Sequence, residues 1–244
     1  MTVGEMLREW RERRRLSQLE LSIQANVSTR HLSFVETGRS RPTSDMILRL
    51  TEHLDVPLRE RNSLLLAGGY APAYPAHDLD SPPLDAVRQA LRQLLAGHEP
   101  YPAVVVDRHW TLVEANRAIG LFTRDCAEHL LTPPVNVLRL SLHPDGMAPR
   151  IGNLAEWRAH LLGRLHRQAI TTGDPKLREL HKELEQYPGG ESMASGDVVV
   201  PLRFDELSFL SISAVFGTPL DVTVAELAIE SFFPADAATA KALL

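Results

Sequence analysis

Residues 16–42 read LSQLELSIQANVSTRHLSFVETGRSRP, and they carry the signals of two short helices joined by a tight turn. Ser17 and Ser28 are suited to begin helices, because a serine side chain accepts hydrogen bonds from the N–H groups that the first helical turn leaves free. Glu20 lies three residues after Ser17 and completes a capping box. Gly38 is suited to end the second helix, which the spacing places at about residues 29–37.

The junction between these helices has the composition of a helix-turn-helix corner. Ala25 and Asn26 fall in the turn, where a small residue and a residue that tolerates left-handed backbone are favoured. The second helix of such a motif fits the major groove of B-DNA. A small core is predicted for Leu21, Val27, Leu32 and Val35, and an outward face for Thr29, Arg30, Ser33 and Phe34.

The flanking sequence predicts three further helices. Apolar residues recur at helical spacing before the motif, again after Pro42, and in a last run that begins at Pro57. We therefore expect an all-α domain of five helices at residues 1–69. Residues 70–83 are rich in proline and lack periodicity, so they are predicted to form a linker.

Residues 84–244 follow a different pattern and predict an α+β domain. Two β-rich runs around a short polar turn predict a hairpin at residues 103–115, and Asn116 is suited to cap a helix after it. Two strands, a helical insertion and three strands favour an antiparallel five-stranded sheet covered by helices. The later helices are predicted at residues 117–130, 153–172 and 175–187, and the later strands near residues 197–204, 207–217 and 227–233.

Composition favours an intracellular protein. The chain has 244 residues and one cysteine, Cys126, so no internal disulfide is possible. Neither a signal peptide nor an apolar run of about 20 residues is present. Residues 1–70 hold 11 arginines, no lysine and 9 acidic residues, a net charge of +2, whereas the remainder carries −7. Only the N-terminal part is therefore suited to an anionic surface.

Residues 3–69 resemble the Xre/phage-repressor type of helix-turn-helix domain. The stretch LREWRERRRLSQLELSIQANVSTRHLSFVETGRSRP carries the resemblance, and the spacing holds over all five helices. The resemblance implies that Gln18 begins the first helix of the motif and contacts DNA, and that Arg11 and Glu36 form an internal ion pair. The matching positions include Arg11, Leu16, Ser17, Gln18, Glu20, Leu21, Val27, Ser28, Glu36, Gly38 and Pro42.

Residues 84–241 resemble the MmyB-like ligand-binding domain, which has a PAS-like fold. The segments that carry this resemblance are HEPYPAVVVDRHWTLVEANRAI, NVLRLSLHPDG, NLAEWRAHLLGRL and FGTPLDVTVAELAIESFFPAD, in that order. The resemblance implies a sensory domain for a small, apolar or acyl-like molecule, and it implies no cofactor.

The candidate DNA contacts follow from the outward face and from the positive charges near it. Arg30 is suited to grip guanine, and Phe34 either packs on thymine methyl groups or folds back against a neighbouring helix. His31, Arg39 and Arg41 are better suited to phosphates. The predicted DNA-binding residues are Gln18, Thr29, Arg30, His31, Ser33, Phe34, Arg39 and Arg41.

The candidate ligand contacts are drawn from the helix predicted at residues 153–172 and from NVLRLSLHPDG, one of the segments that carry the resemblance. Trp157 and Leu161 share an apolar helical face that forms either plain core or the wall of a pocket, and a nearby arginine is suited to an acidic head group. The predicted ligand-binding residues are Asn136, Leu138, Arg139, Leu142, Trp157, Arg158 and Leu161.

The sequence offers little for metal binding or catalysis. His160, His166 and His181 lack the spacing of four residues that places two ligands on one helical face, and Cys126 has no CxxC partner. There is no G-x-S-x-G, P-loop or G-x-G-x-x-G motif. We therefore expect no metal, no catalytic residue and no enzyme.

Together these features predict a bacterial, cytoplasmic transcription regulator that binds double-stranded operator DNA, as a homodimer, and senses a small molecule. Two alternatives remain at this stage. One is a constitutive DNA-binding protein whose C-terminal domain only dimerises, and the other is an enzyme with a DNA-binding appendage.

Overall fold

The computed structural model describes residues 1–190 and 199–244, which divide into two compact units. The first unit holds Met1–His77 and Thr218–Ala225, and the second holds Asp78–Gly217 and Glu226–Leu244. The sequence predicted a linker at residues 70–83. In the structure, residues 70–77 are grouped with the N-terminal helices, and a short segment from far along the chain joins them.

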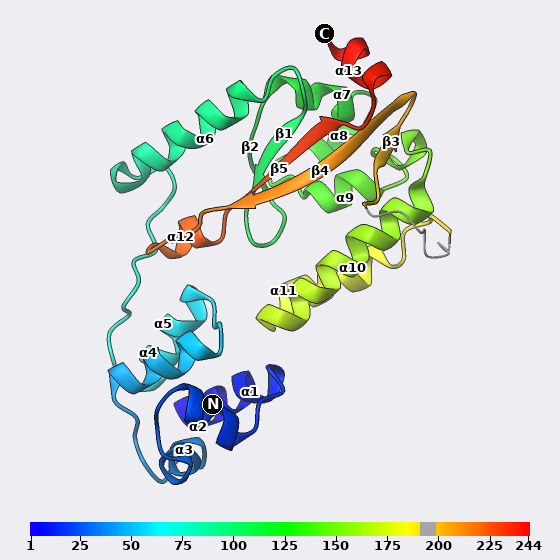
Figure 1. Cartoon of the computed structure of the whole chain (residues 1–244). Coiled ribbons are helices and arrows are strands. Elements are labelled where there is room, and N and C mark those ends of the chain that lie inside the picture. Colours follow the sequence, from blue (N-terminus) through cyan, green and yellow to red (C-terminus); the bar gives the residue numbers. More distant parts are fainter. Residues whose placement is uncertain (191–198) are drawn as a thin grey trace. The chain divides into compact units, whose positions relative to one another are not determined.

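The first unit contains the five helices that the sequence predicts for its N-terminal part (Figure 1). Their apolar faces meet in one core, in which Leu21, Leu32, Ile47 and Leu50 are fully buried. The helices are α1 (Val3–Arg13), α2 (Gln18–Gln24), α3 (Thr29–Glu36), α4 (Ser44–His53) and α5 (Leu58–Ala67).

The signals in residues 16–42 form the predicted local structure. The Ser17 hydroxyl accepts from the Glu20 N–H, and the Glu20 carboxylate accepts from the Ser17 N–H at 2.7 Å. Ser28 caps α3 through the N–H of His31. Asn26 has a φ of 51° and Gly38 one of 74°, so both adopt the left-handed backbone that ends the two helices.

A buried ion pair joins α1 to α3. The Arg11 guanidinium donates from Nε and Nη2 to the two carboxylate oxygens of Glu36, at 2.7 and 2.9 Å. Arg11 also donates to the carbonyl oxygen of Leu16, and Gln18 donates to Glu36 at 2.8 Å. The hydrogen bonds to Glu36 raise the pKa of Arg11, so its guanidinium stays charged. The bonds from Arg11 and Gln18 tie the start of α2 to both helices.

Residues 70–77 are held against α5 in spite of their proline content. The Asn62 side chain accepts from the N–H groups of Ala73 and Tyr74, and it donates to the Tyr74 carbonyl oxygen at 2.7 Å. The Tyr70 hydroxyl donates to the carbonyl oxygen of Pro42. Side-chain hydrogen bonds therefore replace the missing helix or strand partners of this segment.

The distant segment of the first unit includes α12 (Val222–Ala225), which contacts α5. The carboxylate of Asp221 accepts from the His77 N–H and lies 2.8 Å from His77 Nδ1. The Thr223 hydroxyl donates to the His77 carbonyl oxygen at 2.6 Å, and the Val222 N–H donates to Pro75. Burial opposes ionisation of Asp221, but the hydrogen bonds from His77, Val224 and Thr223 outweigh it and lower its pKa.

The second unit is built on an antiparallel five-stranded sheet in the order β2-β1-β5-β4-β3. The last strand in the sequence, β5, lies at the centre and pairs with both β1 and β4. The strands are β1 (Ala103–Val106), β2 (Leu112–Ala115), β3 (Leu202–Phe204), β4 (Leu207–Val215) and β5 (Ala228–Pro234).

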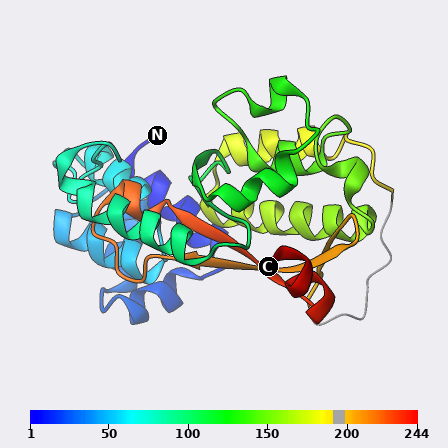
Figure 2. The ribbon, with the colours of Figure 1, turned by 90° about the horizontal axis from the view of Figure 1, so that it is seen from above.

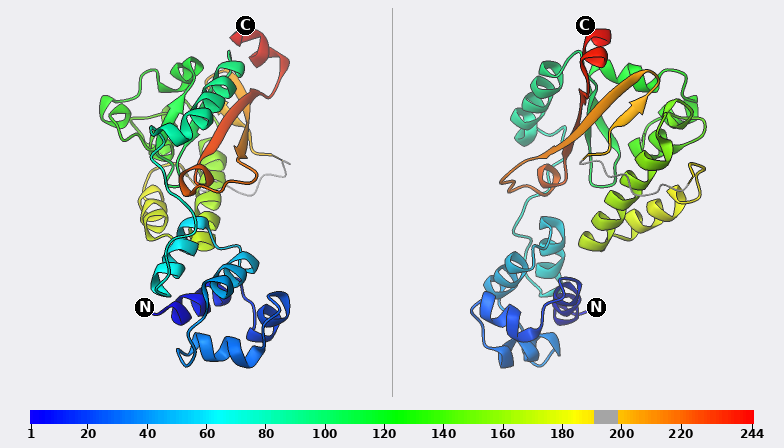
Figure 3. Two further views of the ribbon diagram at one scale, coloured as in Figure 1. Left: turned by 90° about the vertical axis from the view of Figure 1, so that its left-hand side faces the viewer. Right: turned by 45° about the vertical axis from the view of Figure 1, so that its right-hand side comes forward.

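Helices lie on both faces of this sheet, with α6 on one side and α10 and α11 on the other (Figure 3). Leu91 and Leu95 of α6 pack on Val105 and Ile229 of the sheet. Figure 2 shows α13 beside one end of the strands, where it contacts β4 and β5. The helices are α6 (Asp85–Gly97), α7 (Gly120–Thr123), α8 (Glu128–Leu131), α9 (Val137–Leu142), α10 (Leu154–Thr172), α11 (Pro175–Leu184) and α13 (Ala237–Leu243).

The single helix predicted at residues 117–130 is wrong. The structure has a 3-10 turn at Arg117–Ile119 and the short helices α7 and α8, with Asp125 between them at a φ of 66°. Asn116 does not cap a helix, because its side-chain amide donates to the carbonyl oxygens of Leu95 and Tyr101. The strand predicted near residues 197–204 lies partly outside the described residues, and β3 forms its described end.

Loss of Glu36 should destabilise the first unit. In Glu36→Ala the Arg11 guanidinium, whose side chain is 9% exposed, keeps its charge without a carboxylate partner. Removing one partner of a buried pair costs about 3–5 kcal/mol. We expect faster amide hydrogen exchange throughout residues 3–67 of the full-length protein.

Arg8→Ala is the matched control, because Arg8 pairs with Glu12 at the surface and the two side chains are 60% and 53% exposed. Exposed pairs contribute about 0–1 kcal/mol. If the amides of the first unit were equally protected from hydrogen exchange in Glu36→Ala and Arg8→Ala, the buried pair would not be important for stability.

Candidate DNA-binding and ligand-binding sites

The corner between α2 and α3 fixes the direction of α3. Ala25 is fully buried in the turn, and the hydroxyl groups of Ser22 and Thr29 lie 2.7 Å apart across it. Thr29, a predicted DNA contact, therefore also joins the two helices. Gln18, the first residue of α2, is also held within the unit, because its side-chain amide donates a hydrogen bond to Glu36 of α3.

The outer face of α3 carries two exposed side chains, Arg30 and His31, beside the half-buried Ser33 and Phe34. The guanidinium carbons of Arg30 and Arg39 lie 5.4 and 6.0 Å from the centre of the Phe34 ring. Phe34 thus supports two arginines by cation–π contact. The sequence signal for this arrangement is the spacing of four residues from Arg30 to Phe34, which places both on one helical face.

Arg41 has partners within the first unit. Its guanidinium donates to the Gly68 carbonyl oxygen at 2.7 and 3.1 Å and lies over the ring of Tyr70. These bonds occupy the C-terminal end of α5. All three predicted phosphate contacts, His31, Arg39 and Arg41, are exposed, and Arg41 also makes this structural contact.

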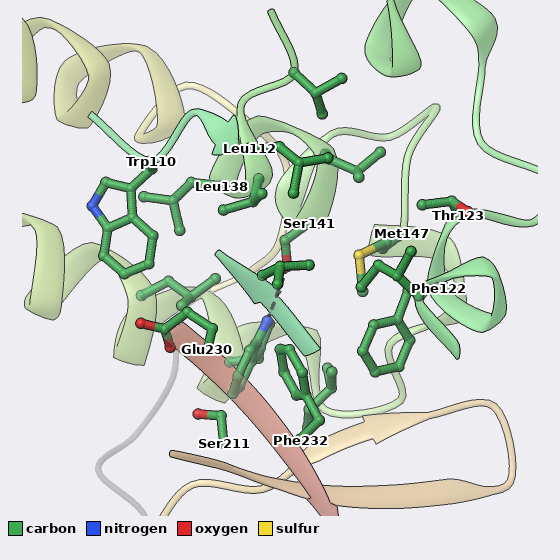
Figure 4. Close-up of a pocket in the computed structure, with 18 of the residues that line it drawn as sticks. Trp110, Leu112, Phe122, Thr123, Leu138, Ser141, Met147, Ser211, Glu230 and Phe232 are labelled. Atoms are coloured by element: carbon green, nitrogen blue, oxygen red, sulfur yellow. Dashed lines mark hydrogen bonds between the residues drawn. The ribbon is translucent and has the colours of Figure 1, made fainter. Parts of the chain in front are cut away.

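The second unit encloses an apolar pocket between one face of the sheet and α9 and α10 (Figure 4). Its cavity has a volume of about 160 Å³. Phe122 and Met147 lie towards one end, Trp110 lies towards the other, and Phe232 lies between them. Other lining residues include Val104, Leu112, Leu131, Val135, Leu140 and Leu202.

Few polar groups reach this pocket. The Trp157 indole donates to the Ser141 hydroxyl at 3.0 Å, which satisfies a buried N–H group. Glu230 on β5 accepts from Nη1 and Nη2 of Arg164 at 2.9 and 2.6 Å. The Arg164 guanidinium carbon lies 4.6 Å from the centre of the Trp110 ring. Both members of this ion pair line the pocket, as does Ser211 of β4.

Three of the predicted ligand contacts line the pocket, namely Leu138, Trp157 and Leu161. Leu142 is fully buried in the core beside it and does not line it. Asn136 caps α9 by accepting from the N–H groups of Leu138 and Arg139. The helical periodicity of residues 153–172 therefore identified two residues of the pocket wall, Trp157 and Leu161.

The two predicted arginines point elsewhere. Arg139 donates to both carboxylate oxygens of Glu183 at 2.7 and 2.8 Å, and this pairing lowers the pKa of Glu183. Arg158 donates to the Glu185 carbonyl oxygen. The pocket instead uses Arg164 and Glu230, which the sequence analysis missed. The available signal was Glu230 itself, a single acidic residue inside the apolar run of β5.

One group of side chains in the described residues has the composition of a metal site. His129, His143 and Asp145 each bring one possible ligand atom, and these atoms lie within 4.8 Å of one another. His143 Nδ1 already accepts from the Asp145 N–H, and the other two residues are exposed. We assign no metal ion to this group.

Comparison with known proteins identifies the family of this chain. Residues 87–244 match the MmyB-like transcription regulator ligand binding domain, which is well over half of the chain. The chain belongs to the MmyB-like transcription regulators. Residues 2–64 match a helix-turn-helix domain, so this regulator carries the DNA-binding head and the ligand-binding domain that the sequence predicts.

Two individual similarities accompany the family match. The MmyB-like chain is 35% identical over 114 residues to an HTH-type transcriptional regulatory protein from Methanoculleus marisnigri. That region is 45% of this chain and 36% of the relative, so the chain spans about a third of the relative's length. A solved RNA-binding light-oxygen-voltage receptor aligns with 93% of this chain and 54% of its own, at 15% identity and a TM-score of 0.28.

Membrane insertion has no support in the helices of this MmyB-like protein. In residues 1–190 and 199–244, none of them combines the length and the apolar character that crossing a bilayer requires.

We predict that Arg30 and Arg39 contribute to DNA binding in different ways. Arg30→Ala should weaken operator binding and relax the preference at one base pair, by about 1–3 kcal/mol, because contacts to base edges carry sequence information. Arg39→Ala should weaken binding to all sequences alike and reduce the salt slope by about 0.9, the value for one phosphate. Fluorescence anisotropy with a selected operator and its single-base variants, at several salt concentrations, measures both effects.

The two variants serve as controls for each other, because both remove an arginine from the Phe34 ring. If both relax the preference at the same base pair, or if both lower only the salt slope, the assignment of base and phosphate contacts is wrong.

Proposed function

We propose that this protein is a cytoplasmic, homodimeric regulator that binds operator DNA through α3 and responds to a small apolar molecule. The observation that carries the proposal is the almost wholly apolar cavity of about 160 Å³ inside its MmyB-like domain. Such cavities stay dry, because water finds too few polar partners in them. A cavity of about 150 Å³ with aliphatic and aromatic walls is large enough for a molecule the size of benzene.

The exposed face of α3 supports base reading by the first unit. Arg30 and His31 project from it, and Phe34 holds Arg30 and Arg39 at its edge. One such head presents a small surface, whereas two heads on a palindrome bury enough area for tight and specific binding. This requirement supports a homodimer.

The segment Thr218–Ala225 supports communication between ligand and DNA. It belongs to the first unit, yet it is the direct continuation of β4 and β5 of the second. Those strands carry Ser211, Glu230 and Phe232 on the pocket wall. A ligand that shifts these strands therefore acts on a covalent extension that Asp221 fastens to His77 in the head. The size of the response equals the ligand's differential affinity for the two states.

Filling the cavity should stabilise the full-length protein. At a ligand concentration one hundred times the dissociation constant, the gain is about 2.7 kcal/mol. A thermal-shift screen of short aliphatic alcohols, acyl esters and fatty acids measures it. Leu161→Trp, which fills the pocket from α10, should abolish the shift.

Ile170→Trp provides the control on the same helix, because Ile170 is 55% exposed and lies outside the pocket. A shift that persists in Leu161→Trp, or no shift with any compound, would favour a C-terminal domain that serves dimerisation alone. Chemical conversion of a bound compound would favour an enzyme.

Asp221→Ala should uncouple ligand binding from operator binding. The variant loses the bonds to His77 but leaves the pocket unchanged, so the ligand should bind with wild-type affinity while its effect on operator affinity falls. Couplings of this kind are typically about 5- to 150-fold, and we expect most of the factor to disappear. Titration of the protein with operator DNA, with and without ligand, gives the ratio of the two operator affinities.

Asp236→Ala is the matched control, since Asp236 caps α13 within the second unit through the N–H of Thr239. Retention of the full ligand effect in Asp221→Ala would exclude the segment as the route of communication.

A further inference from the structure

One end of the pocket carries the polar side chains of Arg164, Ser211 and Glu230, and their chemistry restricts the head group of a ligand. We propose that the pocket selects a small molecule with an apolar body and an uncharged head group that donates a hydrogen bond, such as an alcohol or a primary amide. This inference rests on the proposed binding of a small apolar molecule in the same cavity.

Glu230 is the principal acceptor at that end. Its side chain is 6% exposed, and each of its oxygens accepts one bond from Arg164. A carboxylate has about four lone-pair sites. Within the described residues no further hydrogen bond reaches Glu230, so two acceptor sites remain for a ligand. A ligand donor bound there would satisfy acceptor sites that the apolar walls keep from water.

Ser211 supplies a complementary group. Ser211 lies on β4 directly opposite Phe232 of β5. Phe232 is two residues from Glu230, so the side chains of Ser211 and Glu230 both lie on the pocket face of the sheet. Figure 4 shows the Ser211 hydroxyl and the Glu230 carboxylate near the same end of the pocket. No side-chain hydrogen bond of Ser211 occurs among the described residues. A hydroxyl or amide, which both donates and accepts, fits this pair.

The charge balance excludes ionic head groups. Arg164 and Glu230 neutralise each other inside an apolar wall, so the pocket has no net charge to offer. A carboxylate ligand would have to displace Glu230 from a bidentate pair and leave it buried without a partner. An ammonium ligand would meet the positive charge of Arg164. An uncharged donor is accommodated without disturbing the ion pair.

The opposite end accommodates the body of the ligand. Phe122 and Met147 lie there (Figure 4), and the ring of Phe232, which comes from the strand position opposite Ser211, reaches the Phe122 ring with centres 5.0 Å apart. Aromatic rings and a thioether pack well on a short alkyl chain or a ring. The volume of about 160 Å³ suits a body of roughly six carbon atoms, close to the size of benzene.

A matched series of six-carbon probes tests the head group on the full-length protein. Dissociation constants would be measured at pH 7 by calorimetry for 1-hexanol, hexanamide, hexanoate and hexylammonium. We expect hexanol and hexanamide to bind at least about tenfold more tightly than the two ions, a difference of about 1.4 kcal/mol.

Substitution of Glu230 should reverse one preference. In Glu230→Gln the shape is kept, but Arg164 loses its counter-ion, so hexanoate should gain affinity and hexanol should lose it. Glu183→Gln removes a carboxylate from a similar bidentate pair with Arg139 outside the pocket, and it should leave the order of the probes unchanged.

Ser211→Ala provides a second variant in case Glu230→Gln does not fold. It should weaken hexanol binding by about two- to tenfold, the effect of one hydrogen bond, and leave the ion pair intact. Tightest binding of hexanoate to the wild-type protein, or an unchanged order in Glu230→Gln, would overturn the head-group inference alone. Failure of all four probes to bind would overturn the proposed ligand function as well.

Discussion

The second unit depends on one constraint, the central position of β5. This strand completes two hydrogen-bonded ladders, with β1 from early in the domain and with β4 immediately before it. Its two faces serve different cores, since Ile229 packs under α6 while Glu230 and Phe232 face the pocket. Because its backbone is paired on both sides and its two faces belong to different cores, the strand connects the pocket to the rest of the sheet.

The sequence predicted the head closely because its signals are local. A capping serine, a left-handed Asn26 and a terminal Gly38 each act within one turn of chain, so they can be read without knowledge of tertiary contacts. The ion pair of Arg11 and Glu36 spans 25 residues, and only the family resemblance predicted it. The side-chain bonds of Asn62 to residues 73 and 74 have no periodic signal in the sequence, so they were not predicted.

The pocket was only partly predictable for the same reason. Helical periodicity placed Trp157 and Leu161 correctly on the covered face of α10. It could not choose among arginines, because the carboxylate that each one meets, Glu183 for Arg139 and Glu230 for Arg164, is far away in the sequence. The single helix predicted after Asn116 is interrupted at Asp125, whose left-handed backbone separates α7 from α8. The side chain of Asn116 bonds to Leu95 and Tyr101 in place of its predicted cap.

The division of the chain has a consequence for exchanging parts between related regulators. The backbone passes from one unit to the other at three places, after His77, after Gly217 and after Ala225. A chimera that joins a foreign DNA-binding head at the proline-rich stretch would inherit α12 from the original protein, along with an Asp221 whose partner His77 has been replaced. The transplantable module is therefore a discontinuous one, consisting of residues 1–77 together with 218–225.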